Sequence, residues 1–101
     1  MISSYKLSLQ AELDIEALFD YTEKEFSFDQ ALTYVSAFEP IFQLLIKHPE
    51  MGKVRDEIKP GLRSIRKEAH IIFYRIMKNH IRIVRILHSS RDILRYLKWV
   101  N

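Results

Sequence analysis

The segment spanning residues 61–88, GLRSIRKEAHIIFYRIMKNHIRIVRILH, constrains the fold more than any other part of the chain. It holds three runs rich in Ile, Val, Phe and Tyr, at residues 62–67, 70–77 and 81–88. Such runs, joined by connections of hairpin length, are typical of consecutive antiparallel β-strands. In the last two runs both sets of alternating side chains are largely apolar, so both faces of the sheet are expected to be covered. The chain's own helices can cover one face, which leaves the other open to a partner.

A helical hairpin is predicted before this sheet. Residues 5–9 alternate apolar and polar side chains, which indicates a short strand at a sheet edge. From Gln10 the apolar residues recur every three or four positions, with acidic residues between them, as in an amphipathic helix with an acidic outer face. Ser8 is the expected N-cap of this helix. Capping residues at positions 27–29 begin a second helix, and the short connection makes the pair an antiparallel hairpin.

Prolines and serines predict where the remaining elements begin and end. Pro40 removes one helical hydrogen bond at a cost of ~3 kcal/mol, so the second helix is expected to kink or to split into two abutting segments just before it. The helix should end at His48, which precedes another proline. Residues 53–60 are expected to form a loop. The serines at positions 89–90 are expected to cap a short terminal helix over residues 92–99.

These elements define one fold class. The chain of 101 residues is long enough for one core but not for two, so residues 1–101 are expected to form a single domain. The fold is predicted to be α+β, with an N-terminal strand and a helical hairpin packed on an antiparallel β-sheet and a short C-terminal helix.

The distribution of charge points to an anionic partner. Residues 1–50 contain nine acidic and three basic residues, a net charge of −6, whereas residues 51–101 contain four acidic and thirteen basic residues, a net charge of +9. Such asymmetry indicates that the second half binds either nucleic acid or an acidic protein segment.

Several functional classes are excluded or disfavoured. The chain has no cysteine, which removes thiol catalysis and cysteine-based zinc sites. Its two glycines lie nine residues apart and form no phosphate-binding loop. The histidines lack ligand-like spacing, so we expect no metal and no cofactor. No apolar run is long enough to cross a bilayer and no signal peptide is evident, so we expect a cytoplasmic protein without a membrane partner.

A cluster of basic residues in the strand region is the best candidate for chemistry. Its members are Arg63, Arg66, Lys67, Arg75, Arg85 and His88. Arginines can hold a phosphate and His88 can act as an acid or base near neutral pH, which are the requirements of a metal-free ribonuclease. Alternatively, Arg85 is a half-buried arginine paired with a carboxylate such as Asp56 or Glu57. Trp99, on the basic terminal helix, either anchors an interface or lies over the sheet.

The order of several residues along the chain resembles that of a known family. The residues that carry the resemblance are, in order, Leu7-Ser8 before Ala11, Tyr21-Thr22, Gln30-Ala31, Pro49 with Gly52, Asp56-Glu57-Ile58 with Gly61 and Arg63, His70-Ile71-Ile72-Phe73-Tyr74, and Ile81-Arg82-Ile83-Val84-Arg85-Ile86-Leu87-His88 with Asp92. In this order and at this length they resemble a ParE-type toxin of a bacterial toxin–antitoxin pair, within the ParE/RelE superfamily. The resemblance covers nearly the whole chain and implies a helical hairpin packed on an antiparallel sheet.

The resemblance implies one of two activities. RelE-like and YoeB-like members cut messenger RNA on the ribosome, whereas ParE-like members poison DNA gyrase by binding it. In the YoeB-like nucleases an Arg follows the His that opens its strand, and a Tyr follows the closing His. This chain has Ile71 and Ser89 at those positions, and an isoleucine cannot stabilise a phosphorane. The resemblance therefore favours a gyrase inhibitor without catalytic residues. The alternatives are a ribosome-dependent mRNA endonuclease, using His88, Arg85 and Arg63, or an inactive family member.

The resemblance also implies a cognate antitoxin, ParD-like or of another class, in a toxin–antitoxin hetero-oligomer. An acidic antitoxin segment is expected to fold along the hairpin and the open sheet face, where it buries apolar side chains. The residues expected to bind the antitoxin are Leu18, Tyr34, Phe38, Ile72, Tyr74 and Ile83. The residues expected to bind DNA gyrase are Arg82, Arg91, Arg95, Lys98 and Trp99.

Overall fold

The computed structural model of the protein describes residues 1–97 and contains five strands, four α-helices and a 3-10 turn in that range. In chain order these elements are β1 (Ser4–Leu7), α1 (Leu9–Glu25), α2 (Phe28–Ser36), α3 (Phe38–Lys47), the 3-10 turn η1 (Pro49–Met51), β2 (Lys53–Val54), β3 (Leu62–Lys67), β4 (His70–Ile76), β5 (His80–His88) and α4 (Ile93–Leu97). None of the helices in this range is long and apolar enough to cross a membrane.

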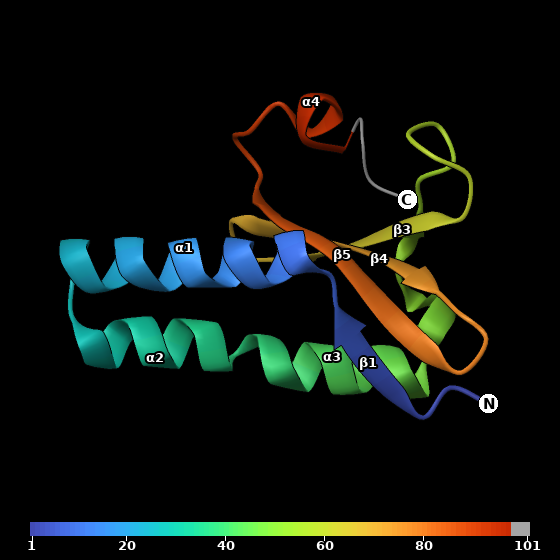
Figure 1. Ribbon diagram of the computed structural model, residues 1–101, viewed down its shortest axis with the longest axis horizontal. Coiled ribbons are helices and arrows are strands. Elements are labelled where there is room, and N and C mark those ends of the chain that lie inside the picture. The colour runs from blue at the N-terminus through green and yellow to red at the C-terminus, as the bar shows by residue number, and fades with distance from the viewer. Residues whose placement is uncertain (98–101) are drawn as a thin grey trace.

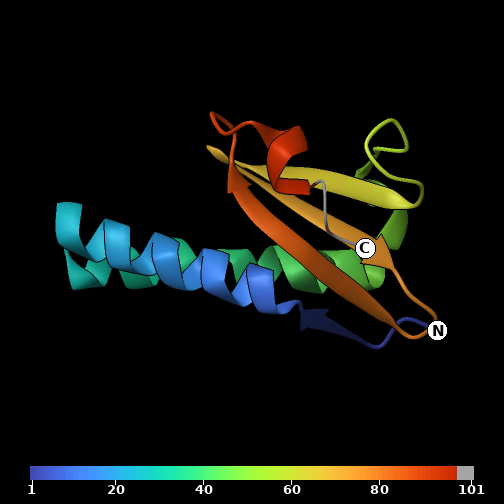
Figure 2. The ribbon, with the colours of Figure 1, turned by 45° about the horizontal axis from the view of Figure 1, so that its top comes forward.

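The strands form one sheet in the order β1-β5-β4-β3-β2 (Figure 1). β1 pairs with β5 in parallel, and the other neighbours are antiparallel. The helical hairpin lies along one side of the sheet and α4 lies on the other side (Figure 2). The predicted α+β fold, with its N-terminal strand, helical hairpin, antiparallel sheet and short terminal helix, is therefore confirmed.

The helix ends follow the predicted capping residues. The Oγ of Ser8 accepts a hydrogen bond from the Ala11 N–H, and Ser27 caps α2 in the same way. The predicted break before Pro40 is present, because α2 ends at Ser36 and α3 begins at Phe38. Pro40 has no N–H to donate to a preceding carbonyl, so the helix cannot continue unbroken through it. As the third residue of α3, Pro40 stands in the first turn, where backbone N–H groups have no helical partner in any case.

Two local predictions were wrong. The expected loop at residues 53–60 begins with the two-residue strand β2, which pairs with β3 at the edge of the sheet. The terminal helix is not capped by the serines at positions 89–90; it begins after Asp92, whose Oδ1 accepts a hydrogen bond from the Arg95 N–H at 3.4 Å. Residues 98 and 99 of the predicted helix lie outside the described residues.

Two apolar clusters pack on opposite faces of the sheet. The larger cluster joins the helical hairpin to the sheet, and its fully buried members are Ala11, Phe38, Phe42, Leu45, Ile72, Tyr74, Ile81, Ile83 and Ile86. The smaller cluster consists of Leu62, Phe73, Val84, Leu87 and Leu97, with Ile58, Ile93 and Tyr96 packed against it. The apolar part of the second face is therefore covered by α4 of the same chain, and the expectation that this apolar surface is open to a partner was wrong.

A β-bulge in β5 changes which side chains reach each face. Phe73 pairs with Arg85 and Tyr74 pairs with Ile83, so Val84 is an extra residue on the β5 side. Uninterrupted alternation predicts that Val84 and Ile86 share a face, but Val84 lies in the cluster under α4 and Ile86 lies in the hairpin cluster. The bulge thereby turns Arg85 away from the row of Ile81 and Ile83.

Candidate functional site

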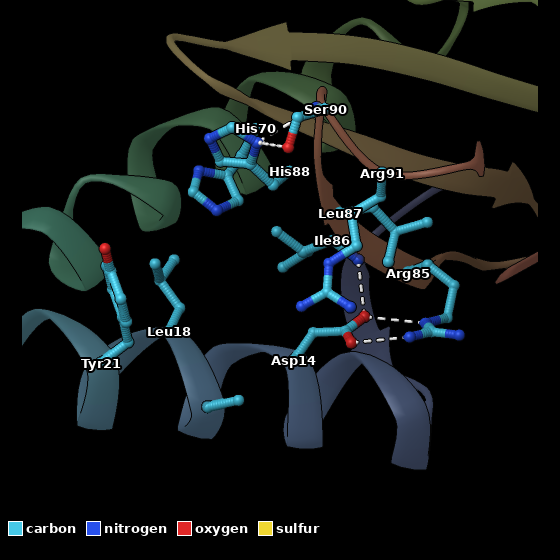
Figure 3. A pocket seen from close by; sticks show the side chains of 11 residues that line it. Asp14, Leu18, Tyr21, His70, Arg85, Ile86, Leu87, His88, Ser90 and Arg91 are labelled. Atoms are coloured by element: carbon cyan, nitrogen blue, oxygen red, sulfur yellow. Dashed lines mark hydrogen bonds and ion pairs between the residues drawn. The ribbon is translucent and has the colours of Figure 1, made fainter.

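An open groove of about 400 Å³ lies between α1 and the end of β5 (Figure 3). One wall is made by α1, through Asp14, Ala17, Leu18 and Tyr21. The other wall is made by His70 of β4, by β5 from Arg85 to His88, and by Ser90 and Arg91 beyond β5. The groove is the place where the helical hairpin, the sheet and the connection to α4 meet.

An ion pair fixes the floor of the groove. The Nε and Nη2 of Arg85 each donate a hydrogen bond of 2.8 Å to the carboxylate of Asp14, as Figure 3 shows. The same carboxylate accepts the Ile86 N–H at 2.9 Å. The two side chains are only 14% and 13% exposed. Hydrogen bonding to Asp14 raises the pKa of Arg85 above its usual value, so this guanidinium is charged and fully engaged.

The prediction that Arg85 is paired with a carboxylate is thus confirmed, but the predicted partners were wrong. Neither Asp56 nor Glu57 pairs with it: Asp56 accepts the Gly61 N–H and Glu57 pairs with Arg55. Asp14 was missed because its acidic neighbours on α1 indicated a solvated surface. The contact joins residues 71 positions apart, and no local pattern contains it.

Two histidines lie side by side at the end of the groove, with ring centroids 5.2 Å apart and nearly perpendicular planes. His70 is buried, and its Nδ1 shares a 2.8 Å hydrogen bond with the hydroxyl of Tyr34. Burial lowers the pKa of His70, and the charge of His88 lowers it further. Near pH 7 His70 is therefore a neutral structural side chain that joins α2 to β4.

His88 is exposed, but its hydrogen bonds restrict its chemistry. Its Nδ1 accepts the Ser90 N–H at 3.1 Å and lies 2.7 Å from the Ser90 Oγ. The proton of the neutral ring is consequently on Nε2, which can donate but cannot accept a proton in that form. His88 in this arrangement is not prepared to act as a general base through Nε2.

The structure does not bring the three candidate nuclease residues together. Arg85 is held by Asp14, and Arg63 donates hydrogen bonds to the carbonyls of Glu50 and Gly52 at 3.2 and 3.0 Å. The strand pairing places Lys67, not Arg63, across from His70 and His88. Arg63 is four residues away along β3, a displacement of about 13 Å. The nuclease hypothesis based on these residues is therefore not supported by their placement. Among residues 1–97, no group of three potential ligands is arranged to hold a metal ion.

Most residues expected to bind an antitoxin are core residues. Phe38, Ile72, Tyr74 and Ile83 are at most 1% exposed, so their side chains cannot contact a partner while the chain is folded. They were chosen because an apolar stripe predicts burial without saying whether the chain itself provides the cover. Leu18 lies in the groove, and Tyr34 is partly buried against His70.

An apolar row on α1 was missed. Leu9, Leu13, Ala17 and Tyr21 follow one another at intervals of four residues and are all exposed, with Leu9 at 66%, Leu13 at 52% and Tyr21 at 62%. Side chains at this spacing form a continuous ridge on a helix surface, and the last two members border the groove. The signal was available in the sequence: leucines occur at positions 9 and 13, on the acidic side of the helix.

The residues expected to bind DNA gyrase are spread over the face that carries α4. Arg91, in the connection before α4, and Arg95, within α4, are exposed, and the Arg91 guanidinium lies 5.0 Å from the centroid of the Tyr96 ring. Arg82 lies near the opposite end of β5, across from Arg75. Lys98 and Trp99 lie outside the described residues.

Known proteins share both the sequence pattern and the fold. A sequence model described as the ParE toxin of the type II toxin–antitoxin system parDE matches residues 5–93. Toxin ParE1 of Mycobacterium tuberculosis is 34% identical over 98 residues, which cover 96% of this chain and all of that protein. Toxin ParE1 of Caulobacter vibrioides is 28% identical over 92% of this chain and 96% of that protein.

A solved structure from a chromosomal ParDE toxin–antitoxin system of P. aeruginosa superposes with a TM-score of 0.75 at 23% identity. The match covers 87% of this chain and 96% of that chain, so the fold is shared almost throughout. The family match extends from β1 to the first residue of α4 and includes both walls of the groove. The chain belongs to the ParE family of type II toxin–antitoxin toxins.

Proposed function

We propose that this chain inhibits DNA gyrase by binding it, without catalysis, and that a cognate antitoxin neutralises it by occupying the helical hairpin and the groove. The single observation that carries the first part is the commitment of Arg85 to Asp14. A ribonuclease of this fold needs a free cation at the scissile phosphate. Here Arg85, the candidate catalytic arginine of β5, is neutralised by Asp14, and Ile71 occupies the position where the YoeB-like nucleases have an arginine.

The apolar row on α1 supports the proposed antitoxin site. An amphipathic segment can lay its apolar side chains against Leu9 and Leu13 and continue past Tyr21 into the groove. Leucines exposed in such a row leave a contiguous apolar surface in contact with water in the isolated chain, which is typical of a protein interface. Arg91 and His88, at the far wall, give acidic groups of that segment a place to bind.

The α4 region is the proposed gyrase-binding surface, through Arg91, Arg95, Lys98 and Trp99. Removing the chain after Ser90 is a poor test of this role, because it also removes Leu97, which is fully buried in the second core cluster. Replacing Arg91 and Arg95 by Gln keeps Leu97 in the cluster and removes only the contacts of Arg91 with Tyr96 at the edge of that cluster. We expect the double variant to lose gyrase inhibition and to keep its unfolding midpoint.

The proposal is tested by titrating the purified protein into a supercoiling reaction with gyrase and relaxed plasmid. The product of the neighbouring antitoxin gene is added in one arm, and translating ribosomes with mRNA form a parallel arm. We expect inhibition of supercoiling that the antitoxin reverses, and no mRNA cleavage. Cleavage of ribosome-bound mRNA without any effect on gyrase would establish the nuclease alternative, in which His88→Ala should lower the rate by ~10² or more.

The antitoxin site is tested separately with two variants that introduce the same charge. Leu13→Glu places a carboxylate in the apolar row, whereas Gln43→Glu places one at an exposed position of α3. We expect Leu13→Glu to weaken antitoxin binding at least tenfold and to leave gyrase inhibition unchanged, because burying an unpaired charge costs more than ~1.4 kcal/mol. Equal affinities of the two variants for the antitoxin would place its site elsewhere.

A further inference from the structure

Three cations form a line across three adjacent strands. In the sheet register Lys6 of β1 is the partner of Arg82 of β5, and Arg82 is the partner of Arg75 of β4. Residues in register point to the same face, and neighbouring strands lie about 4.8 Å apart, so the line is about 10 Å long. Tyr5 and Ile83, which alternate with these residues along their strands, pack into the hairpin cluster. The cation row, Lys6-Arg82-Arg75, therefore lies on the opposite face, near the β4–β5 turn.

The charges of the cation row are not compensated by the described part of the chain. Arg55, Lys67 and Arg85 each have a carboxylate oxygen within 4.0 Å. Within residues 1–97, no carboxylate oxygen lies that close to Lys6, Arg82 or Arg75. Like charges directly opposite one another in a sheet are destabilising. The row is an arrangement that an anion bound across the strands would stabilise.

One arginine of the row is held in place by the backbone. The Nη1 of Arg75 donates a 2.6 Å hydrogen bond to the Pro60 carbonyl. Gly61 has φ +81°, a backbone conformation that favours glycine, and a Cβ at this position would make a tight contact of 3.1 Å with the Arg75 Nη1. The Nε of Arg75 is buried and has no hydrogen-bond partner among the described residues. Nη2 is therefore the nitrogen of Arg75 that is left for a ligand.

A hollow of about 620 Å³ lies beside the row, lined by Gly61, Arg75, Ile76, Met77, His80 and Arg82. The Nδ1 of His80 is 2.9 Å from the Asn79 Oδ1, so this nitrogen carries the ring proton. The hollow is at the opposite end of β5 from His88 and the groove.

We propose that the cation row is a binding site for the phosphate backbone of double-stranded DNA. Three cations at this spacing can neutralise on the order of three backbone phosphates, and the salt dependence of binding reports that number. The guanidinium of Arg82 can bind two phosphate oxygens at once, and Nη2 of Arg75 can donate to the same phosphate. Within residues 1–97, the three residues of the row lie on strands and none lies on a helix that could enter a groove, so the contact is expected to be independent of base sequence. An acidic protein segment is the competing ligand, and the experiment distinguishes the two.

If the chain inhibits gyrase as proposed, this site would let the toxin bind the DNA that is bound to gyrase. This role of the site rests on the proposed function. The DNA contact itself is measured without gyrase. A fluorescent 20-base-pair duplex of mixed sequence is titrated with the full chain at 50, 100 and 200 mM salt. Three neutralised phosphates predict a slope of log K against log salt of about −2.7, and thus a loss of affinity of roughly 40-fold over this range.

Matched variants assign the binding to the row. Arg82→Gln and Lys6→Gln should each reduce the magnitude of the slope by about 0.9, whereas Lys47→Gln, on α3, removes the same charge and should leave the slope unchanged. Unchanged melting temperatures show that the variants are folded. Absence of binding at 50 mM salt, or equal losses in all three variants, would overturn the proposal.

A poly-glutamate peptide of matched charge supplies the remaining arm. If it binds more tightly than the duplex and loses binding in Arg82→Gln, the row recognises an acidic protein and not DNA. Duplex binding without gyrase inhibition would leave this inference standing and refute the proposed function. Gyrase inhibition without duplex binding would refute this inference and leave the proposed function standing.

Discussion

The ion pair between Asp14 and Arg85 should be a principal link between the hairpin and the sheet. We consider the substitution Asp14→Asn, which keeps the shape of the side chain and removes its charge. Removing one partner of a buried ion pair costs about 3–5 kcal/mol. Arg85 retains the Tyr96 carbonyl at 3.2 Å, and asparagine can still accept one hydrogen bond, so the cost should lie at or just below the lower limit of this range. We expect a loss of about 2–3 kcal/mol in the free energy of unfolding, which is a decrease in melting temperature of roughly 10–20 °C.

Urea unfolding followed by far-UV circular dichroism measures this loss, with the m-value as the check that the unfolding transition is comparable. Asp20→Asn is the matched control, because Asp20 is an exposed carboxylate on the same helix, and it should cost less than about 0.5 kcal/mol. A double-mutant cycle with Arg85→Met isolates the interaction. We expect a coupling energy of about 2 kcal/mol between the two sites. Equal effects of Asp14→Asn and Asp20→Asn, or a coupling near zero, would refute the argument.

Three further perturbations test other parts of the structure. Burial lowers the pKa of His70, so His70 is protonated at a higher pH in the unfolded chain than in the folded one, and the free energy of unfolding should fall as pH decreases from 7 to 5. His70→Asn should flatten this dependence in denaturant titrations, and a wild-type free energy of unfolding that does not change with pH would contradict the prediction. A Cβ at Gly52 would lie 2.9 Å from the Ser64 carbonyl oxygen, so Gly52→Ala should cost at least about 2 kcal/mol in thermal melts, and a neutral effect would show that the turn can shift. Ser8→Ala removes an N-cap and a 2.7 Å bond to a β5 carbonyl, so it should cost about 1–2 kcal/mol, more than Ser27→Ala at an exposed cap, and equal costs would contradict the buried bond.

The elements that sequence predicts well are those whose causes are local. The strand at residues 62–67 coincides with β3, and the break before Pro40 is present, because side-chain pattern and proline geometry act within a few residues. The bulge at Val84 was not predictable in this way. The bulged stretch of β5 pairs with β4 and also makes hydrogen bonds with Ser8, the N-cap of α1, and with Asp14 of α1. Contacts between the two ends of the chain determine that geometry.

The candidate site was harder to predict because a residue buried in the core and a residue buried in an interface are both apolar in the sequence. Ile72 and Ile83 were expected at an interface, but the chain's own hairpin covers them. Leu9 and Leu13 were not predicted as binding residues, because they lie outside the stripe of α1 that faces the core. An apolar residue on the wrong side of a well-formed amphipathic helix is thus more informative about a partner than one on the apolar side.

The placement of the two proposed surfaces constrains how neutralisation can work. The apolar row of α1 lies on the hairpin, whereas the cation row lies on the sheet face that carries α4, so a ligand on one need not exclude a ligand on the other. An antitoxin fragment that covers only the hairpin should therefore bind without restoring supercoiling. Extending the fragment into the groove, toward Arg91, should restore it. This is measured with antitoxin fragments of increasing length in the supercoiling reaction, and full neutralisation by the shortest binding fragment would mean that the hairpin itself contacts gyrase.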